Sequence, residues 1–175
     1  MKTLFLLRHS KSSWKDTRLD DHDRPLNGRG RDEALLVGEY MRQRGLTPAF
    51  VAVSTARRAM QTAAEVLGVL RYNGLVRVSR DLYLAEAESL LAFIAKTPGR
   101  YPNLLVIAHN PGLELLLESL TGQAAPMPTS SLVHIELPIE TWRELFPDQN
   151  STLLENWRPL KIRSQNLLTT VALVV

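Results

Sequence analysis

The sequence has 175 residues, of which 45% are hydrophobic and none is cysteine. This length and hydrophobic content suffice to bury one sizeable core, so we expect a single domain over residues 1–175. Lysine and arginine outnumber aspartate and glutamate by only 21 to 18 and are scattered, which argues against a nucleic-acid partner. The lack of cysteine excludes disulfides and thiolate metal sites from this sequence and is typical of a reducing compartment, so we expect a cytoplasmic protein.

The apolar runs near the two ends do not predict membrane insertion. Residues 3–7 and 167–175 are both far shorter than the ~20 residues that a helix needs to span a bilayer. The first run is also shorter than the apolar part of a signal peptide. We therefore expect no membrane partner, and the sequence leaves open the role of the apolar tail at residues 164–175.

Three short apolar runs without alternation, Leu4–Leu7, Phe50–Val53 and Leu104–Ala108, are typical of strands that are covered on both faces. Helical patterns separate or follow them, at residues 31–44, 58–70, 88–96 and 113–120. After Ser131, apolar and polar residues alternate as in a half-exposed strand, and residues 153–162 predict another strand. The order of strands and helices predicts an α/β fold, a three-layer α/β/α sandwich with a largely parallel central sheet.

Basic and imidazole side chains follow the predicted buried strands. Arg8 and His9 follow the first run, Arg57 and Arg58 follow the second, and His109 follows the third. Ligands of open α/β sheets gather at the carboxyl ends of the strands. Arginine forks match phosphate oxygens, and a neutral imidazole nitrogen can attack phosphorus. Either histidine alone is equally typical of a polar turn, but together with the arginines they favour a phosphate site.

These residues resemble motifs of the histidine phosphatase superfamily. Residues 8–10, Arg-His-Ser, are similar to its Arg-His-Gly signature, and residues 58–62, Arg-Ala-Met-Gln-Thr, match its Arg-Ala-x-Gln-Thr motif. His109 matches the second histidine of the family. A finer resemblance to the SixA-type phosphohistidine phosphatases is carried by segments 8–14, 23–30 and 109–114. The resemblance implies a fold like that of phosphoglycerate mutase.

The resemblance also implies the roles of individual residues. His9 would be the nucleophile that carries the phosphoryl group, and Arg8, Arg58 and His109 would bind that group. Ser10 stands where the family has glycine, and its hydroxyl is a further candidate phosphate ligand. The resemblance implies no cofactor and no metal, because positive side chains can supply the field that phosphoryl transfer needs.

The loop after His9 contains further candidates. We expect Lys11, Trp14 and Arg24 to belong to a substrate loop, with Trp14 either lining the pocket mouth or fastening the loop to the body. The same loop carries four aspartates, which we interpret as solvated loop residues rather than a metal site. They are Asp16, Asp20, Asp21 and Asp23.

The position where many family members have a proton-donating glutamate is occupied by residues 82–85, Leu-Tyr-Leu-Ala. Glu86 and Glu88 lie nearby but out of place, and carboxylates are favoured at a helix start in any case. We therefore expect a phosphatase for phosphohistidine, in a protein or as a related phosphoramidate. The alternatives are a small-molecule phosphomonoesterase or mutase on the same scaffold and, less favoured, a non-catalytic phosphate-binding module.

Overall fold

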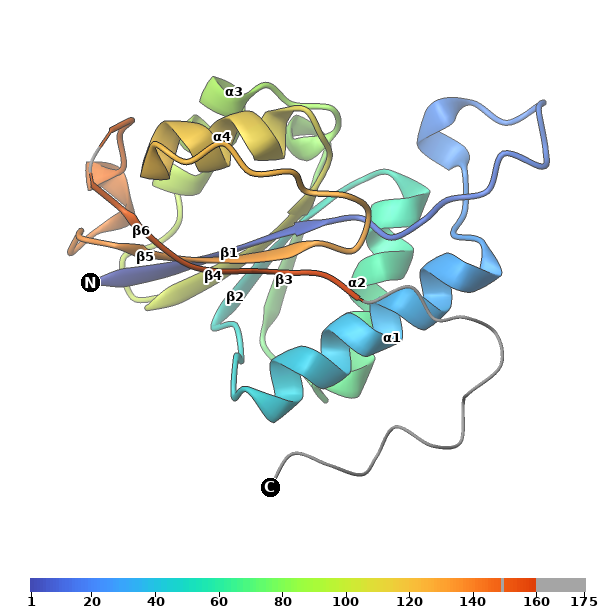
Figure 1. Cartoon of the computed structure of the whole chain (residues 1–175), viewed down its shortest axis with the longest axis horizontal. Coiled ribbons are helices and arrows are strands. Elements are labelled where there is room, and N and C mark those ends of the chain that lie inside the picture. Colours follow the sequence, from blue (N-terminus) through green and yellow to red (C-terminus); the bar gives the residue numbers. More distant parts are fainter. Residues whose placement is uncertain (149, 160–175) are drawn as a thin grey trace.

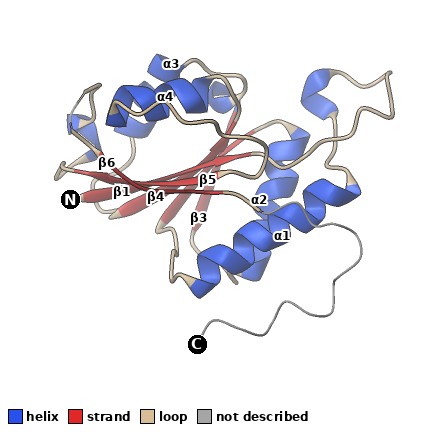
Figure 2. Ribbon diagram, viewed as in Figure 1, coloured by secondary structure: helices blue, strands red, loops and turns tan. Residues whose placement is uncertain are grey.

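The computed structural model describes residues 1–148 and 150–159, and the apolar tail at 164–175 lies outside this part. One six-stranded sheet forms its centre, and helices cover both faces (Figures 1 and 2). The predicted three-layer α/β/α architecture is confirmed.

The strands of the sheet are β1 Lys2–Arg8, β2 Phe50–Ser54, β3 Leu75–Ser79, β4 Asn103–Ala108, β5 Leu132–Leu137 and β6 Thr152–Trp157. Their order across the sheet is β3-β2-β4-β1-β5-β6. The first four in this order are mutually parallel, β5 is antiparallel to β1, and β6 is antiparallel to β5. The largely parallel sheet is therefore confirmed, with its antiparallel part at one edge.

The helices are α1 Gly28–Gln43, α2 Arg57–Val69, α3 Ala87–Ala95 and α4 Gly112–Thr121. Figure 2 shows α1 and α2 on one face of the sheet and α3 and α4 on the other. Strand β1 contributes side chains to both hydrophobic cores. Leu4 and Leu6 pack with side chains of α3 and α4. Phe5 and Leu7 pack with side chains of α1 and α2 on the other face. Covering on both faces explains why its apolar run does not alternate.

Two predicted boundaries differ from the structure by three residues or more, for local reasons. The helix expected from residue 31 begins at Gly28, because the side chain of Asn27 caps it by accepting from the Gly30 N–H at 2.8 Å. The last strand was expected through residue 162 but ends at Trp157, and residues 160–162 lie outside the described part. Pro159 cannot donate a backbone hydrogen bond to a continuing ladder.

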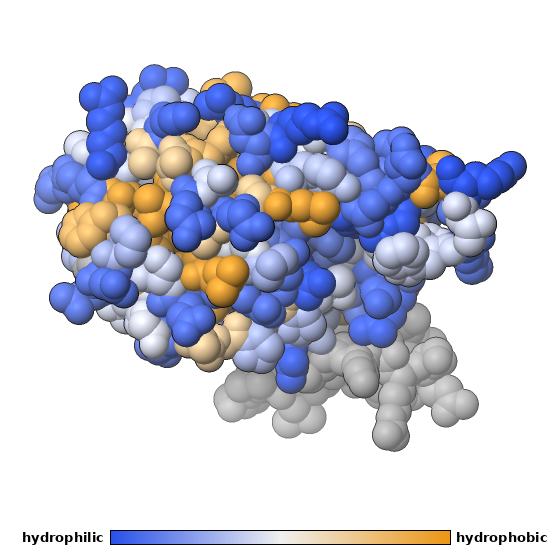
Figure 3. Space-filling view, turned by 90° about the horizontal axis from the view of Figure 1, so that it is seen from above, coloured by the Kyte–Doolittle hydropathy of each residue, from blue (hydrophilic) through white to orange (hydrophobic). Residues whose placement is uncertain are grey.

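The surface above α3 and α4 mixes hydrophobic and hydrophilic side chains (Figure 3). Leu115 of α4 is 45% exposed there. Among the helices of the described residues, none has both the length and the apolar character to cross a membrane. The carboxyl ends of β1, β2 and β4 all reach the same edge of the sheet. The sheet therefore brings together the polar residues that follow these three strands.

Candidate active site

A pocket of about 290 Å³ lies at this edge of the sheet. Its lining combines the ends of β1 and β4 and the loop after β1 with the first turn of α2, the segment before α3 and the segment before β5. The residues are Arg8, His9, Lys11, Ser12, Trp14, Asp21, Arg24, Arg58, Leu84, His109, Asn110 and Thr129. Because β1 and β4 are neighbours with Arg8 opposite Ala108, the residues that follow them, His9 and His109, are delivered side by side. The pocket thus contains the four residues that the family resemblance implied as the catalytic set.

His9 is a neutral imidazole whose Nε2 carries an electron pair that accepts a hydrogen bond from Arg58. Its Nδ1 lies 2.8 Å from the carbonyl oxygen of Ser10, and the Nε of Arg58 donates to its Nε2 at 3.2 Å. Only the tautomer with the proton on Nδ1 satisfies both contacts. Burial lowers the pKa of His9 to about 4, aided by the neighbouring arginines and opposed by the Ser10 hydrogen bond. Nε2 therefore carries a lone pair at neutral pH, as the nucleophilic role implied by the resemblance requires.

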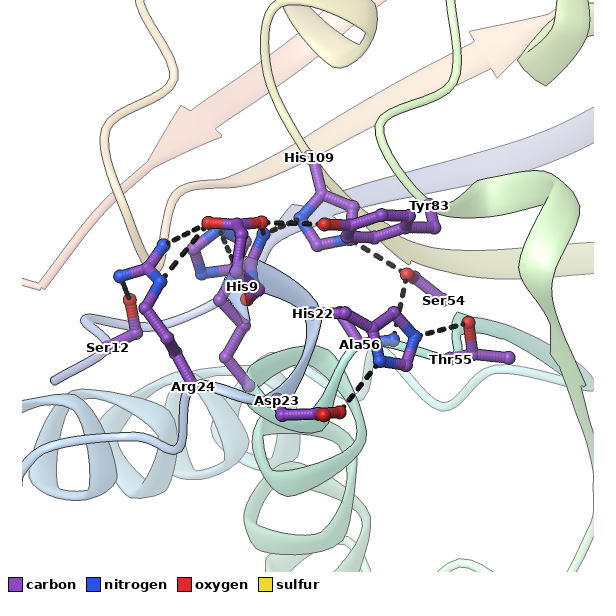
Figure 4. A network of polar contacts seen from close by, with 12 residues as sticks. His9, Ser12, His22, Asp23, Arg24, Ser54, Thr55, Ala56, Tyr83 and His109 are labelled. Carbon is purple, nitrogen blue, oxygen red and sulfur yellow. Dashed lines mark hydrogen bonds and ion pairs between the residues drawn. The ribbon is translucent and has the colours of Figure 1, made fainter. Parts of the chain in front are cut away.

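Arg58 is hydrogen bonded to both histidines of the pocket. Figure 4 shows His109 close to His9 and Tyr83. Arg58 lies in the first turn of α2, is 2% exposed, and places an Nη2 donor 3.3 Å from Nδ1 of His109. The Nε2 of His109 lies 2.8 Å from the hydroxyl of Ser54 at the end of β2. Burial, with the nearby positive charge of Arg58, lowers the pKa of His109 to about 3. The His9 and His109 ring centroids are 5.0 Å apart, close enough for both rings to contact one phosphoryl group.

The Arg8 guanidinium has one hydrogen-bonded donor, Nη1, and one buried donor without a partner among the described residues, Nε. Its Nη1 donates to the carbonyl oxygen of Met127 at 2.9 Å, which fixes the guanidinium against the loop before β5. Its buried Nε has no hydrogen-bond partner among the described residues. A buried donor without a partner costs free energy, which an anionic oxygen in the pocket would recover. Arg8 is thus suited to the phosphoryl-binding role that the resemblance implied.

Ser10 lies below the pocket rather than in its lining. It is fully buried, its N–H donates to Thr62 Oγ1 at 3.0 Å, and its hydroxyl oxygen lies 2.8 Å from Ser130 Oγ. Ser130 in turn donates to a carboxylate oxygen of Glu33 at 3.1 Å. The hydroxyl expected near phosphate is instead joined to this buried polar group, and phosphate binding by Ser10 remains a prediction.

The three substrate-loop candidates all line the pocket. Arg24 is 7% exposed and donates from Nη1 to Ser12 Oγ at 2.8 Å. Its guanidinium carbon lies 3.4 Å from the centroid of the Trp14 ring, which is itself 69% exposed. Since Trp14 stacks on Arg24 and is not packed into the body, the structure favours its position at the pocket mouth. Lys11 is exposed beside it.

The interpretation of Asp21 as one of the solvated loop aspartates is wrong, because Asp21 lines the pocket and pairs with Arg24 and Arg58. Its Oδ1 accepts from Nη2 of Arg24 at 2.7 Å, and its Oδ2 accepts from Arg58 at 3.0 Å and from the Tyr83 hydroxyl at 2.7 Å. Partial burial opposes ionisation, but hydrogen bonds from Tyr83 and Arg24 and the charge of Arg58 hold the pKa of Asp21 well below its usual range. The sequence signal that could have identified Asp21 is its spacing of three residues from Arg24, with which it forms an ion pair.

Two other loop aspartates have partners outside the pocket: Asp16 pairs with Arg18, and Asp23 contacts His22. Glu86 precedes α3, and Glu88 lines a separate depression between α3 and α4. Leu84 occupies the pocket wall near the expected donor position. Among the described residues, Asp21 is consequently the sole carboxylate in the pocket lining.

Chelation by EDTA is expected to leave the activity unchanged. The buried guanidinium and imidazole groups provide the positive and hydrogen-bonding field around the phosphoryl oxygens. In residues 1–148 and 150–159, no group of three or more histidine, aspartate and glutamate side chains is placed to hold a metal ion. Turnover before and after dialysis against EDTA tests this expectation. Full loss of activity that one divalent metal restores would contradict it and direct attention to the loop aspartates.

Comparison with known proteins agrees with this geometry. Residues 4–89 match the model of the histidine phosphatase superfamily, branch 1. An uncharacterized chloroplastic protein of Arabidopsis thaliana is 31% identical over 157 residues, which cover 83% of this chain and 71% of that protein. A phosphoglycerate mutase of a Nocardioides species is 43% identical over 67 residues, or 37% of this chain and 27% of the mutase.

A solved structure extends the similarity over the whole sheet. The crystal structure of a candidate phosphohistidine phosphatase SixA from Agrobacterium tumefaciens superposes with a TM-score of 0.78 and 25% identity. The superposition covers 90% of this chain and 98% of that one. With the two motif regions and the paired histidines brought together in one pocket, the chain belongs to the histidine phosphatase superfamily and is a phosphatase.

Proposed function

We propose that the chain hydrolyses the P–N bond of phosphohistidine, in a protein or in a related phosphoramidate, through a covalent phosphohistidine on His9. The observation that carries the proposal is the pocket composition: a neutral nucleophile and buried arginines, without a carboxyl group able to donate a proton. The nearest carboxylate, Asp21, is held ionised by Arg24, Arg58 and Tyr83.

The first step transfers the phosphoryl group to His9. Arg58 Nε first gives up its hydrogen bond to Nε2 and donates to a phosphoryl oxygen instead. The electron pair on Nε2 then forms a bond to phosphorus while the P–N bond of the substrate breaks, and the electron pair of that bond goes to the leaving nitrogen. When the second ring nitrogen of the substrate phosphohistidine carries a proton, its imidazole ring leaves as a neutral group. Arg8, Arg58 and His109 surround the phosphoryl oxygens during the transfer.

The second step releases phosphate. A water molecule attacks phosphorus, the bond from phosphorus to Nε2 breaks, and its electron pair returns to His9. The proton of the attacking water leaves with the phosphate product. Nδ1 keeps its proton throughout, because it stays bonded to the Ser10 carbonyl, so His9 ends as the neutral tautomer from which it began. Two displacements thus replace one difficult hydrolysis.

A general acid matters because of the leaving group. An alkoxide is a strong base that normally needs a proton in the transition state, whereas imidazole, with a conjugate-acid pKa of about 6.5, departs neutral. The phenol of Tyr83 is not a ready donor, since partial burial and the Asp21 carboxylate raise its pKa. The pocket therefore favours P–N substrates on chemical grounds even where an ester fits.

We expect kcat/KM for phosphoramidate and a phosphohistidine protein to exceed that for glycerol phosphate by roughly 10² or more, the usual scale of a missing general acid. Steady-state kinetics on this panel, each with a His9→Ala blank, measure the ratio. Equal efficiency on phosphoramidate and glycerol phosphate would refute the substrate proposal and indicate Glu86 or Glu88 as a donor that moves into the pocket.

The second candidate is a small-molecule phosphomonoesterase or mutase. The sequence similarity to a phosphoglycerate mutase, 43% identical over 67 residues, favours it. The pocket wall argues against it, since Leu84 stands near the expected donor position. Transfer of phosphate from a bisphosphate to a second acceptor in the same panel would support this candidate.

A further inference from the structure

Asp21 shares one guanidinium group with the nucleophile. Arg58 donates from Nε to Nε2 of His9 at 3.2 Å and from Nη2 to Oδ2 of Asp21 at 3.0 Å. A single guanidinium group therefore bridges the carboxylate of Asp21 and Nε2 of His9. The Asp21 side chain lines the pocket and is 42% exposed, so part of the carboxylate is open to solvent.

All the acceptor positions of this carboxylate are used. Oδ1 accepts from Nε and Nη2 of Arg24, at 3.1 and 2.7 Å, and Oδ2 accepts from Arg58 and Tyr83. A carboxylate offers about four lone-pair sites. Arg58 Nη2 serves both this carboxylate and Nδ1 of His109. A phosphoryl group that took the Nη2 donor from Asp21 would free one site on Oδ2, while Arg24 and Tyr83 would still hold the carboxylate in place.

We propose that Asp21 is a specificity-determining residue whose freed Oδ2 accepts an N–H from the leaving group of the substrate. The inference deepens the proposed function and rests on it. It assigns a substrate class to the site: phosphoryl donors whose leaving group carries a proton on nitrogen. It assigns to Arg24 and Tyr83 the task of positioning the carboxylate.

The chemistry of phosphoimidazole explains the benefit. With phosphorus on one ring nitrogen, the ring can leave as neutral imidazole only if the other nitrogen is protonated before the P–N bond breaks. A carboxylate that accepts from this N–H stabilises the protonated, reactive form of the substrate. After the bond breaks, the electron pair lies on the leaving nitrogen and the proton stays where it was, so Asp21 neither gains nor loses a proton.

The same carboxylate disfavours leaving groups that depart as oxyanions. A negative charge that develops on an ester oxygen near Asp21 is repelled, and a carboxylate without a proton cannot neutralise it. Asp21 therefore discriminates in both directions, whereas a residue that only oriented Arg58 would affect all substrates alike. This difference is the basis of the test.

The experiment compares Asp21→Asn with wild-type protein on two small substrates. Phosphoramidate carries protons on its leaving nitrogen, and p-nitrophenyl phosphate releases a weakly basic oxyanion that needs no proton. We expect kcat/KM for phosphoramidate to fall roughly 10- to 100-fold, the scale of one hydrogen bond to a charged group. The value for p-nitrophenyl phosphate is expected to stay constant or rise, and Tyr83→Phe should shift both in the same sense by less.

Asp23→Asn is the matched control, because Asp23 lies in the same loop, is 61% exposed and contacts His22 rather than the pocket arginines. Both kcat/KM values should be unchanged in this variant. An equal fall on the two substrates in Asp21→Asn would overturn the proposal by showing that Asp21 acts through Arg58. An equal rise would overturn it by showing that the carboxylate only obstructs phosphate. The substrate proposal itself fails separately, if wild-type protein does not prefer phosphoramidate to glycerol phosphate.

Discussion

Replacement of His9 by alanine is expected to abolish turnover and formation of the phosphoenzyme while the fold stays intact. Loss of a covalent nucleophile in other hydrolases lowers kcat by roughly 10⁴-fold or more. His9 follows the end of β1 and contacts Ser10 and Arg58 through its ring, so its side chain is not part of either apolar core. Single-turnover trapping of labelled phosphate, together with far-UV circular dichroism, measures both parts.

His134→Ala provides the control for this experiment. His134 lies in β5, where its ring packs 4.9 Å from that of Phe5, and it does not line the pocket. This variant should keep its activity.

The pH profile offers a second check, because burial lowers the pKa of His9 to about 4 and the neutral form dominates above that value. Wild-type kcat/KM should not fall from loss of this nucleophile until pH drops below about 5. An acid-labile phosphoenzyme in His9→Ala would remove His9 from its role.

Arg58→Ala and His109→Ala are each expected to lose ~10²–10³-fold in kcat, the cost of removing one preorganised donor. Arg58 is the hydrogen-bonding centre of the pocket, since it contacts both histidines and Asp21. Its planar fork matches two phosphoryl oxygens, which lysine cannot imitate. Arg58→Lys should therefore recover only part of the loss. Steady-state kinetics on phosphoramidate measure all three variants.

The neighbouring arginine is the matched control. Arg57 is exposed and outside the pocket lining, whereas Arg58 is buried within it, although both lie in the first turn of α2. Arg57→Ala should therefore have a small effect. If it proved the more damaging change, the assignment of the Arg-Ala-x-Gln-Thr motif would be wrong by one residue, and the pocket would need a different central cation.

The elements that the sequence predicts best are those with a local physical signal. The runs Leu4–Leu7 and Leu104–Ala108 lack alternation because both faces of β1 and β4 are covered, and this burial is visible in composition alone. The helical pattern at residues 113–120 places the end of α4 within one residue of Thr121. Gly122 follows with a φ of 67°, a conformation that glycine adopts at little cost. Boundaries such as the start of α1 depend on one capping hydrogen bond and were placed less well.

The sequence by itself determined the layered α/β fold, because the strand and helix patterns are contiguous signals. Through the family resemblance it also predicted four site residues, His9, His109, Arg8 and Arg58, which line one pocket in the structure. Only the tertiary structure decided what lies around them. The Ser10 hydroxyl faces Ser130, 120 residues away, rather than the pocket. Asp21 meets Arg58 across 37 residues and Tyr83 across 62. Such contacts follow from which strands are neighbours and how a loop folds back over them, and neither periodicity nor spacing encodes that information.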